Sequence, residues 1–236
     1  MNTDDYSRRR FVRRGLTLAG VAFAWSTFQS NSFARQAKVK SPTNPDEALA
    51  ELSAGNKRYV TGKNIHRDFG PERPALAEGQ QPFAIILGCA DSRVAPELAF
   101  DQSRGRLFVV RLAGNFVDDN GLASMEFGAS VLGACLIMVL GHNECGAVKA
   151  AVNVVTKNAQ LPGHLPGLVA NLKPAVEKAQ QETGSLVDNA IRENVLLHVE
   201  TLSNSEPVLA DLVKKNRLRV VGGLYDLASG RVEVLS

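Results

Sequence analysis

Four short apolar runs alternate with longer stretches of helical periodicity along this chain. The runs lie at 83–88, 107–110, 135–140 and 218–223, and each is bounded by glycine and polar residues. Runs of this length are typical of strands that are buried on both faces of a parallel sheet. The stretches at 121–134, 145–156, 168–183, 187–202 and 207–216 predict helices. The alternation indicates an α/β fold with a mostly parallel central sheet of four strands, flanked by helices.

Two further elements frame this core. Pro45 predicts the start of a helix that runs to about Val60 and forms an N-terminal helical arm, with Asp46 and Glu47 in its first turn. A polar loop is expected over 61–81. Residues 230–235 alternate between glycine or charged and apolar side chains after a turn, which predicts a hairpin return as a fifth, antiparallel edge strand.

The N-terminal residues 1–34 differ from the rest. Arginines at 8–10, an apolar stretch over 15–28 and the small-x-small sequence Ser-Phe-Ala at 32–34 together define a secretory leader. The sequence at 7–13 also resembles a twin-arginine leader, which implies export of the folded protein to a periplasm, or to a thylakoid lumen in a source that has one. A disordered basic arm and an uncleaved anchor are the alternatives. We predict a signal peptide over 1–34, a linker over 35–45 and one domain over 46–236.

The net charge of the chain without its leader gives no support for a nucleic-acid partner. Residues 1–34 hold five of the 27 basic and two of the 24 acidic residues, so the rest of the chain has 22 of each sign. No basic surface remains that would attract a polyanion. The apolar stretch of the leader is too short and too rich in small residues to span a membrane, and we expect no stable membrane insertion after leader removal.

Polar clusters follow two of the predicted strands directly. Cys89, Asp91 and Arg93 come after the first run, and His142 and Cys145 come after the third. In open α/β sheets, ligands bind at the carboxyl ends of the strands. Thiolate and imidazole are the ligands that zinc prefers, and a set of two cysteines and one histidine leaves a fourth position open, as catalytic zinc sites do.

Two residues of these clusters fit a role beside the metal. Zinc lowers the pKa of bound water, and Asp91 is able to accept a hydrogen bond from that water. A bidentate pair with Arg93 would keep Asp91 ionised and hold it off the metal, whereas a free Asp91 would become a fourth ligand and close the site. A structural zinc site and a Cys89–Cys145 disulfide remain open alternatives, because an exported chain meets an oxidising compartment. Cys135 is expected to be a buried, inert thiol.

The two clusters, read as Cys-Ala-Asp-Ser-Arg-Val at 89–94 and His-Asn-Glu-Cys-Gly at 142–146, resemble those of β-class carbonic anhydrases. The segments at 55–59, 108–115 and 222–230 extend the resemblance over residues 45–236, in the order of the family. The resemblance implies reversible hydration of CO2 to bicarbonate and a proton by zinc-bound hydroxide. It implies one Zn2+ per subunit on Cys89, His142 and Cys145, with Asp91 and Arg93 as the catalytic pair.

The resemblance also implies a substrate pocket and an assembly. It points to Gln80 from the partner subunit, Phe108 and Gly146 as pocket residues, whereas the sequence alone favours a loop position for Gln80 and a core position for Phe108. The family implies a homodimer or a larger homo-oligomer, with the helix at 46–60 embracing the partner.

Control by bicarbonate is not expected. A regulated subclass builds a second bicarbonate pocket with a tryptophan three residues before the first cysteine, where this chain has Ile86, although Arg111 matches the arginine of that pocket. Hydrolysis of carbonyl sulfide or carbon disulfide on the same scaffold is the closest alternative activity. A zinc- or bicarbonate-binding module without turnover is the alternative from another class.

Overall fold

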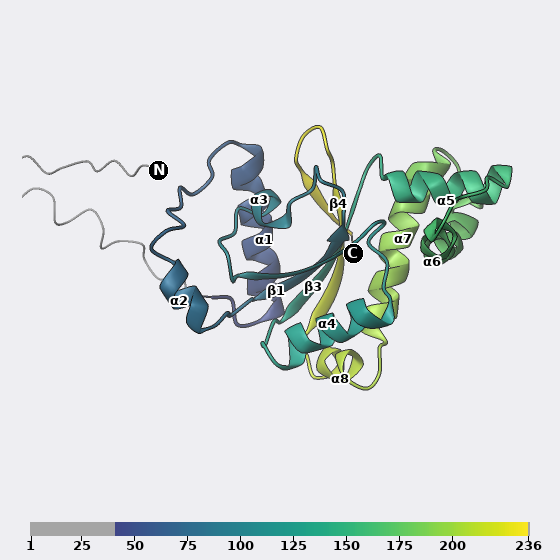
Figure 1. Cartoon of the computed structure of the whole chain (residues 1–236). Coiled ribbons are helices and arrows are strands. Elements are labelled where there is room, and N and C mark those ends of the chain that lie inside the picture. The colour runs from purple at the N-terminus through teal and green to yellow at the C-terminus, as the bar shows by residue number, and fades with distance from the viewer. Residues whose placement is uncertain (1–40, 236) are drawn as a thin grey trace, which may run out of the picture. The chain divides into compact units, whose positions relative to one another are not determined.

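The computed structural model describes residues 41–235, and within them the chain forms an α/β fold around one sheet (Figure 1). The five strands stand in the order β2-β1-β3-β4-β5. Pairs among β1 to β4 are parallel, and β5 returns antiparallel to β4. In chain order the strands are β1 (Ala84–Cys89), β2 (Leu107–Leu112), β3 (Leu136–His142), β4 (Arg219–Tyr225) and β5 (Val232–Leu235). The predicted fold class and the antiparallel edge strand are confirmed.

Helices cover both faces of the sheet because the central strands are apolar on both sides. Every residue of β1 and β3 is buried. Ile86 packs on the side of α1 and α3, whereas Ile85 and Leu87 pack on the side of α4, α7 and α8. The helices are α1 (Pro45–Val60), α2 (Arg73–Glu78), α3 (Pro96–Ala99), α4 (Asp119–Ser130), α5 (Gly146–Lys157), α6 (Leu165–Ala179), α7 (Leu186–Ser203) and α8 (Leu209–Lys214).

The helix α1 begins where the sequence indicated. The Asn44 side chain accepts a hydrogen bond from the Glu47 N–H over 2.9 Å, which caps the first turn. Ala48 and Leu52 are fully buried in the core beneath the sheet, so this helix packs on its own subunit. The expectation that it also embraces a partner stays a prediction.

The segment at 61–81 departs from the expected loop. It contains the helix α2, six residues long with none of them buried. A helix that buries no residue shows no apolar periodicity, so the hydrophobic pattern gave no signal for it. The four-residue helix α3 was missed because one turn is too short to show a period.

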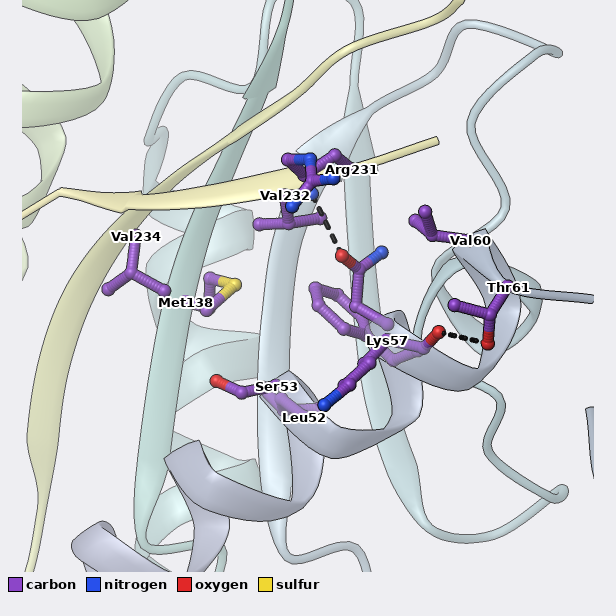
Figure 2. A pocket seen from close by; sticks show the side chains of 11 residues that line it. Leu52, Ser53, Lys57, Val60, Thr61, Met138, Arg231, Val232 and Val234 are labelled. Carbon is purple, nitrogen blue, oxygen red and sulfur yellow. Dashed lines mark hydrogen bonds between the residues drawn. The ribbon is translucent and has the colours of Figure 1, made fainter. Parts of the chain in front are cut away.

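A cavity of about 340 Å3 lies between α1 and the β4–β5 hairpin. Figure 2 shows Lys57 and Val60 of α1 facing Arg231 and Val232 across it. None of the five polar residues predicted to form the catalytic site lines this cavity. Among the helices of residues 41–235, none combines the length and the apolar character that crossing a bilayer requires. The predicted signal peptide lies outside the described residues.

Candidate metal centre

The sheet places the two polar clusters side by side because β1 and β3 are direct neighbours. Gly88 pairs with Leu140, so β1 ends at Cys89 and β3 ends at His142 within one residue of the same level. The chain passes from β1 to β2 on one side and then crosses to β3 on the other. The clusters therefore lie at the topological switch point of the sheet, where open α/β folds bind ligands.

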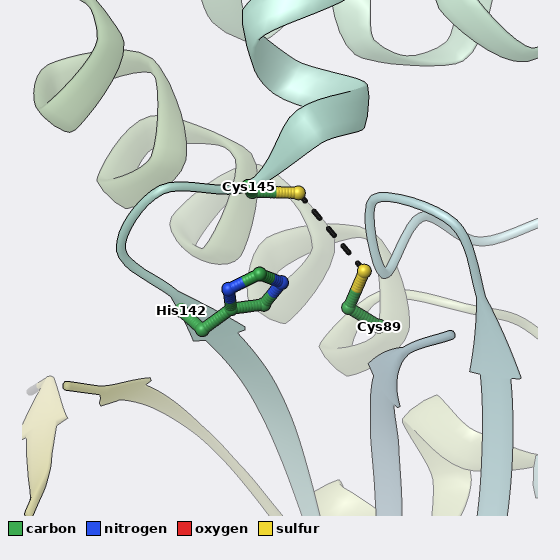
Figure 3. Close-up of side chains that lie close together, drawn as sticks. All are labelled: Cys89, His142 and Cys145. Carbon is green, nitrogen blue, oxygen red and sulfur yellow. Dashed lines mark hydrogen bonds between the residues drawn. The ribbon is translucent and has the colours of Figure 1, made fainter. Parts of the chain in front are cut away.

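Cys89, His142 and Cys145 form a compact group of metal-binding side chains. One nitrogen and two sulfur atoms lie within 4.8 Å of one another, and all three residues are buried. Figure 3 shows the imidazole of His142 turned toward the sulfur of Cys89, with Cys145 opposite, at the start of α5. The two sulfurs are 4.0 Å apart and both thiols are free. A disulfide requires about 2 Å between sulfurs, so the disulfide alternative is wrong for this structure.

The imidazole is oriented for metal binding by its own loop. His142 Nδ1 lies 2.8 Å from the carbonyl oxygen of Asn143, to which it donates as the neutral Nδ1–H tautomer. That bond leaves a lone pair on Nε2, and this atom is fully buried without a hydrogen-bond partner in the described part of the chain. A buried, unpaired nitrogen beside two thiols is costly unless a cation occupies the space between them. The donor set and its orientation fit zinc.

The electrostatics favour an anionic sulfur. A hydrogen bond from the Cys145 thiol lowers the pKa of Cys89 to about 4, against the opposing effect of burial. Cys145 retains the proton of the pair, and the bond to Cys89 together with burial raises its pKa. Burial lowers the pKa of His142, but the neighbouring Cys89 sulfur and the bond to the Asn143 carbonyl outweigh it, and the net shift is upward.

Asp91 is held beside this group by Arg93. The guanidinium donates from Nε to Asp91 Oδ1 over 2.9 Å and from its terminal nitrogen to Oδ2 over 2.7 Å. The Arg93 backbone N–H adds a third bond to Oδ1. The Arg93 bonds are the main cause of a pKa for Asp91 well below its usual range. Asp91 Oδ2 lies 3.9 Å from His142 Nε2, so the carboxylate faces the metal group without belonging to it.

The predicted substrate residues are distributed differently. Gly146 opens α5 directly after Cys145, and a Cβ atom there would meet nothing within 4 Å in the described part of the chain. Gln80 is an exposed residue just beyond α2. Phe108 pairs with Ile85, four positions before the end of β2, and its ring lies 6.4 Å from that of Phe127. Phe108 is half-buried and packs against the core of its own subunit. The roles of these three residues in a substrate pocket stay predictions.

Sequence reasoning missed two supports of the loop at 89–93. Arg111 donates from Nε to the Cys89 carbonyl over 2.8 Å and to the Asp91 carbonyl over 2.6 Å, which fixes the backbone that carries both residues. The Gly114 N–H donates to Cys89 Sγ over 3.3 Å. An arginine at the end of a strand next to the first cluster was the available signal for Arg111, whereas a backbone donor leaves no sequence signal.

Comparisons with known proteins agree with this geometry. The sequence profile of the family described as carbonic anhydrase matches residues 84–232. The chain is 38% identical over 195 residues to a carbonic anhydrase of Mycolicibacterium smegmatis. The matched region covers 82% of this chain and 95% of that protein. It is also 38% identical to carbonic anhydrase 2 of Mycobacterium tuberculosis, over 80% of this chain and 92% of that protein.

Solved structures resemble the fold over a similar span. Tetrameric β-carbonic anhydrases of the ascomycete Sordaria macrospora match with a TM-score of 0.62 and 25% identity, over 81% of this chain and 96% of theirs. A Coccomyxa β-carbonic anhydrase in complex with acetazolamide matches with a TM-score of 0.61 and 26% identity, over 80% of this chain and 82% of that one.

Proposed function

The chain belongs to the β-class carbonic anhydrase family, and from that premise we propose that it is a zinc enzyme that reversibly hydrates CO2 to bicarbonate and a proton. The observation that carries the proposal is the buried, unpaired His142 Nε2 within 4.8 Å of two thiol sulfurs. Cys89, His142 and Cys145 would hold one zinc ion per subunit. Zinc bound there would lower the pKa of a water molecule to about 7 and so supply hydroxide near neutral pH.

Asp91 would orient the attacking water. Its carboxylate is ionised throughout the neutral range because Arg93 lowers its pKa, and an ionised carboxylate only accepts hydrogen bonds. Oδ2 faces the three metal-binding side chains. It would accept one hydrogen of the water molecule, and a lone pair on the water oxygen would then point toward the carbon of CO2. Arg93 keeps the carboxylate at this distance because it binds both oxygens.

The walls of the site suit an apolar substrate. Phe116 and Val148 are buried in the same cluster as the two cysteines, and Leu112 packs against it. CO2 carries no net charge and gains from an apolar surrounding, whereas bicarbonate is better solvated by water. This difference favours release of the charged product.

A homo-oligomer would complete the site. The strand β2 is one edge of the sheet. Beside it, Phe127 of α4 is 47% exposed and Val131, which directly follows α4, is 66% exposed. An open edge next to exposed apolar side chains indicates a surface that a second subunit covers. These side chains lie near the start of β2, where Phe127 contacts Phe108, and a partner that extends along the whole edge would also reach its carboxyl end, where Leu112 pairs with Cys89. The partner's copy of the exposed loop at Gln80 is then the candidate for the predicted pocket amide.

Sedimentation velocity tests this assembly. The wild-type chain should sediment as a dimer or a multiple of it, and Phe127→Glu should lower the mass. A monomeric wild type would refute the proposed assembly.

We also propose that the enzyme works outside the cytoplasm, in a periplasm, on the strength of the leader-like sequence at 1–34. Cell fractionation and N-terminal sequencing of the mature protein test this. Cleavage near residue 35 is expected, and an intact cytoplasmic chain would overturn the proposal.

Stopped-flow CO2 hydration with a pH indicator tests the activity itself. Cys145→Ser and chelation of the metal should each abolish the catalysed rate. Cys135→Ser is the matched control, because this third cysteine is buried outside the metal group. Equal rates for Cys145→Ser and wild type would refute the zinc mechanism. Consumption of carbonyl sulfide is measured in parallel. If carbonyl sulfide is hydrolysed faster than CO2 is hydrated, carbonyl sulfide is the substrate in place of CO2.

A further inference from the structure

The turn that follows β2 directs a backbone donor at one of the metal-binding sulfurs. The Asn115 N–H donates to the Leu112 carbonyl over 2.9 Å and closes the turn. Gly114 occupies its third position with φ of 92°, the left-handed conformation that a type II turn requires there. In this conformation the Gly114 N–H reaches Cys89 Sγ at 3.3 Å. The direction of that N–H depends on how the whole turn is held.

Asn194 of α7 binds the second peptide group of Gly114, the one that contains its carbonyl. Its Nδ2 donates to the Gly114 carbonyl over 2.9 Å, across 80 residues of sequence. The side chain is 1% exposed. Gly114 therefore makes two hydrogen bonds that hold it in place. Its N–H donates to the Cys89 sulfur, and its carbonyl accepts from Asn194.

Asparagine is a costly residue at this position for stability alone. It lies on the buried face of α7 together with Ile191 and Val195. Its Oδ1 is buried and makes no hydrogen bond within the described residues. A leucine, which has the same branching at Cγ, would pack against these apolar neighbours without burying an unpaired acceptor. The bond to Gly114 is the contact that leucine would not supply.

We propose that Asn194 is a positioning residue for the metal ligand Cys89 and acts through the two peptide groups of Gly114. The inference rests on the proposed function only in that Cys89 binds a metal. Without the Asn194 amide, the buried Gly114 carbonyl must find another donor. The turn then rotates and the N–H moves away from Cys89 Sγ. Hydrogen bonds from the surroundings orient metal ligands, and their loss typically lowers metal affinity about 10- to 100-fold.

Cobalt substitution of the full chain tests this directly. Cobalt(II) bound to thiolate absorbs by sulfur-to-metal charge transfer, which reports on the bonds of Cys89 and Cys145 to the metal without any turnover. The affinity is measured by competition with a chromophoric chelator. Asn194→Leu should weaken cobalt binding at least tenfold and alter the charge-transfer band.

Leu202→Ala is the matched control. Leu202 is fully buried on the same helix, two turns beyond Asn194, and its truncation destabilises α7 without touching Gly114. It should lower the melting temperature and leave cobalt affinity and spectrum unchanged. Asn194→Ser, which is smaller and too short to reach Gly114, should repeat the effect of Asn194→Leu if the leucine variant does not fold.

Two results would overturn the proposal: wild-type affinity and spectrum in a folded Asn194 variant, or an equal change in Leu202→Ala. The proposed function is judged separately by CO2 hydration of the wild type. A wild type that binds cobalt through sulfur but does not hydrate CO2 would refute the function and leave the role of Asn194 standing.

Discussion

Replacing Asn56 by alanine would remove three hydrogen bonds that join α1 to two other parts of the fold. Nδ2 donates to the Ala99 carbonyl over 2.9 Å and to the Gly230 carbonyl over 2.8 Å, and Oδ1 accepts from the Val232 N–H over 2.9 Å. The residue is 7% exposed. At about 1 kcal/mol net for each bond, the free energy of unfolding should fall by about 3 kcal/mol. In a chain of this size that corresponds to a melting temperature lower by about 6–12 °C.

Urea unfolding followed by far-ultraviolet circular dichroism measures this loss. Protein concentration is held constant, since the stability of an oligomer depends on it. Asn171→Ala is the control, because Asn171 is an exposed asparagine of α6 with a single bond to the Gly167 carbonyl at 2.9 Å, and it should cost less than about 0.5 kcal/mol. A loss below about 1 kcal/mol at Asn56, or one no larger than the control, would refute this reasoning.

Three further outcomes are expected. Arg93→Met should lower CO2 hydration at least about tenfold while zinc stays bound, because Asp91 loses both side-chain bonds from the guanidinium; an unchanged rate would contradict this. Burial lowers the pKa of His198 to about 4 from 6.5, so the unfolded chain binds a proton that the folded chain does not. Stability should therefore fall by about 3 kcal/mol as pH drops from about 6.5 to about 4, and urea unfolding at both ends of that window should show a smaller fall in His198→Leu. A side chain at Gly141 would lie 2.6 Å from Val195 Cγ2, so Gly141→Ala should cost about 1–3 kcal/mol, and Val195→Ala in the same chain should recover part of it.

The sheet was predictable from the sequence because its strands are buried on both faces. Runs such as 83–88 have few alternatives to a central parallel strand, and the hairpin at 230–235 carried its own turn signal. The boundaries of helices were less accurate: α6 begins at Leu165 rather than near 168. Helix ends depend on caps and on packing rather than on periodicity.

The metal-binding residues were predictable because chemistry restricts them to few residue types. The contacts that orient them were not, since they join positions far apart in the chain. Arg111 reaches the Cys89 carbonyl across 22 residues and Asn194 reaches Gly114 across 80. Asn194 is a polar residue on the apolar, buried face of α7, and this departure from the pattern can be seen in the sequence. Nothing in the sequence indicates which group it binds. The role proposed for Gln80 is a contact with a second subunit, and such a contact leaves no pattern in the sequence of one chain.

The three proposed metal ligands come from the ends of two strands, β1 and β3, and this would link metal supply to the amount of folded protein. Cys89 and Cys145 are 56 residues apart in sequence and approach each other only when β1 and β3 pair. A metal that needs all three ligands therefore binds the folded chain much more tightly than the unfolded chain. Each tenfold rise of free metal above its dissociation constant adds about 1.4 kcal/mol to the stability of the fold. If the three side chains hold zinc as proposed, scarcity of zinc should expose the protein to proteolysis, and cells short of zinc should lose the polypeptide itself as well as its activity.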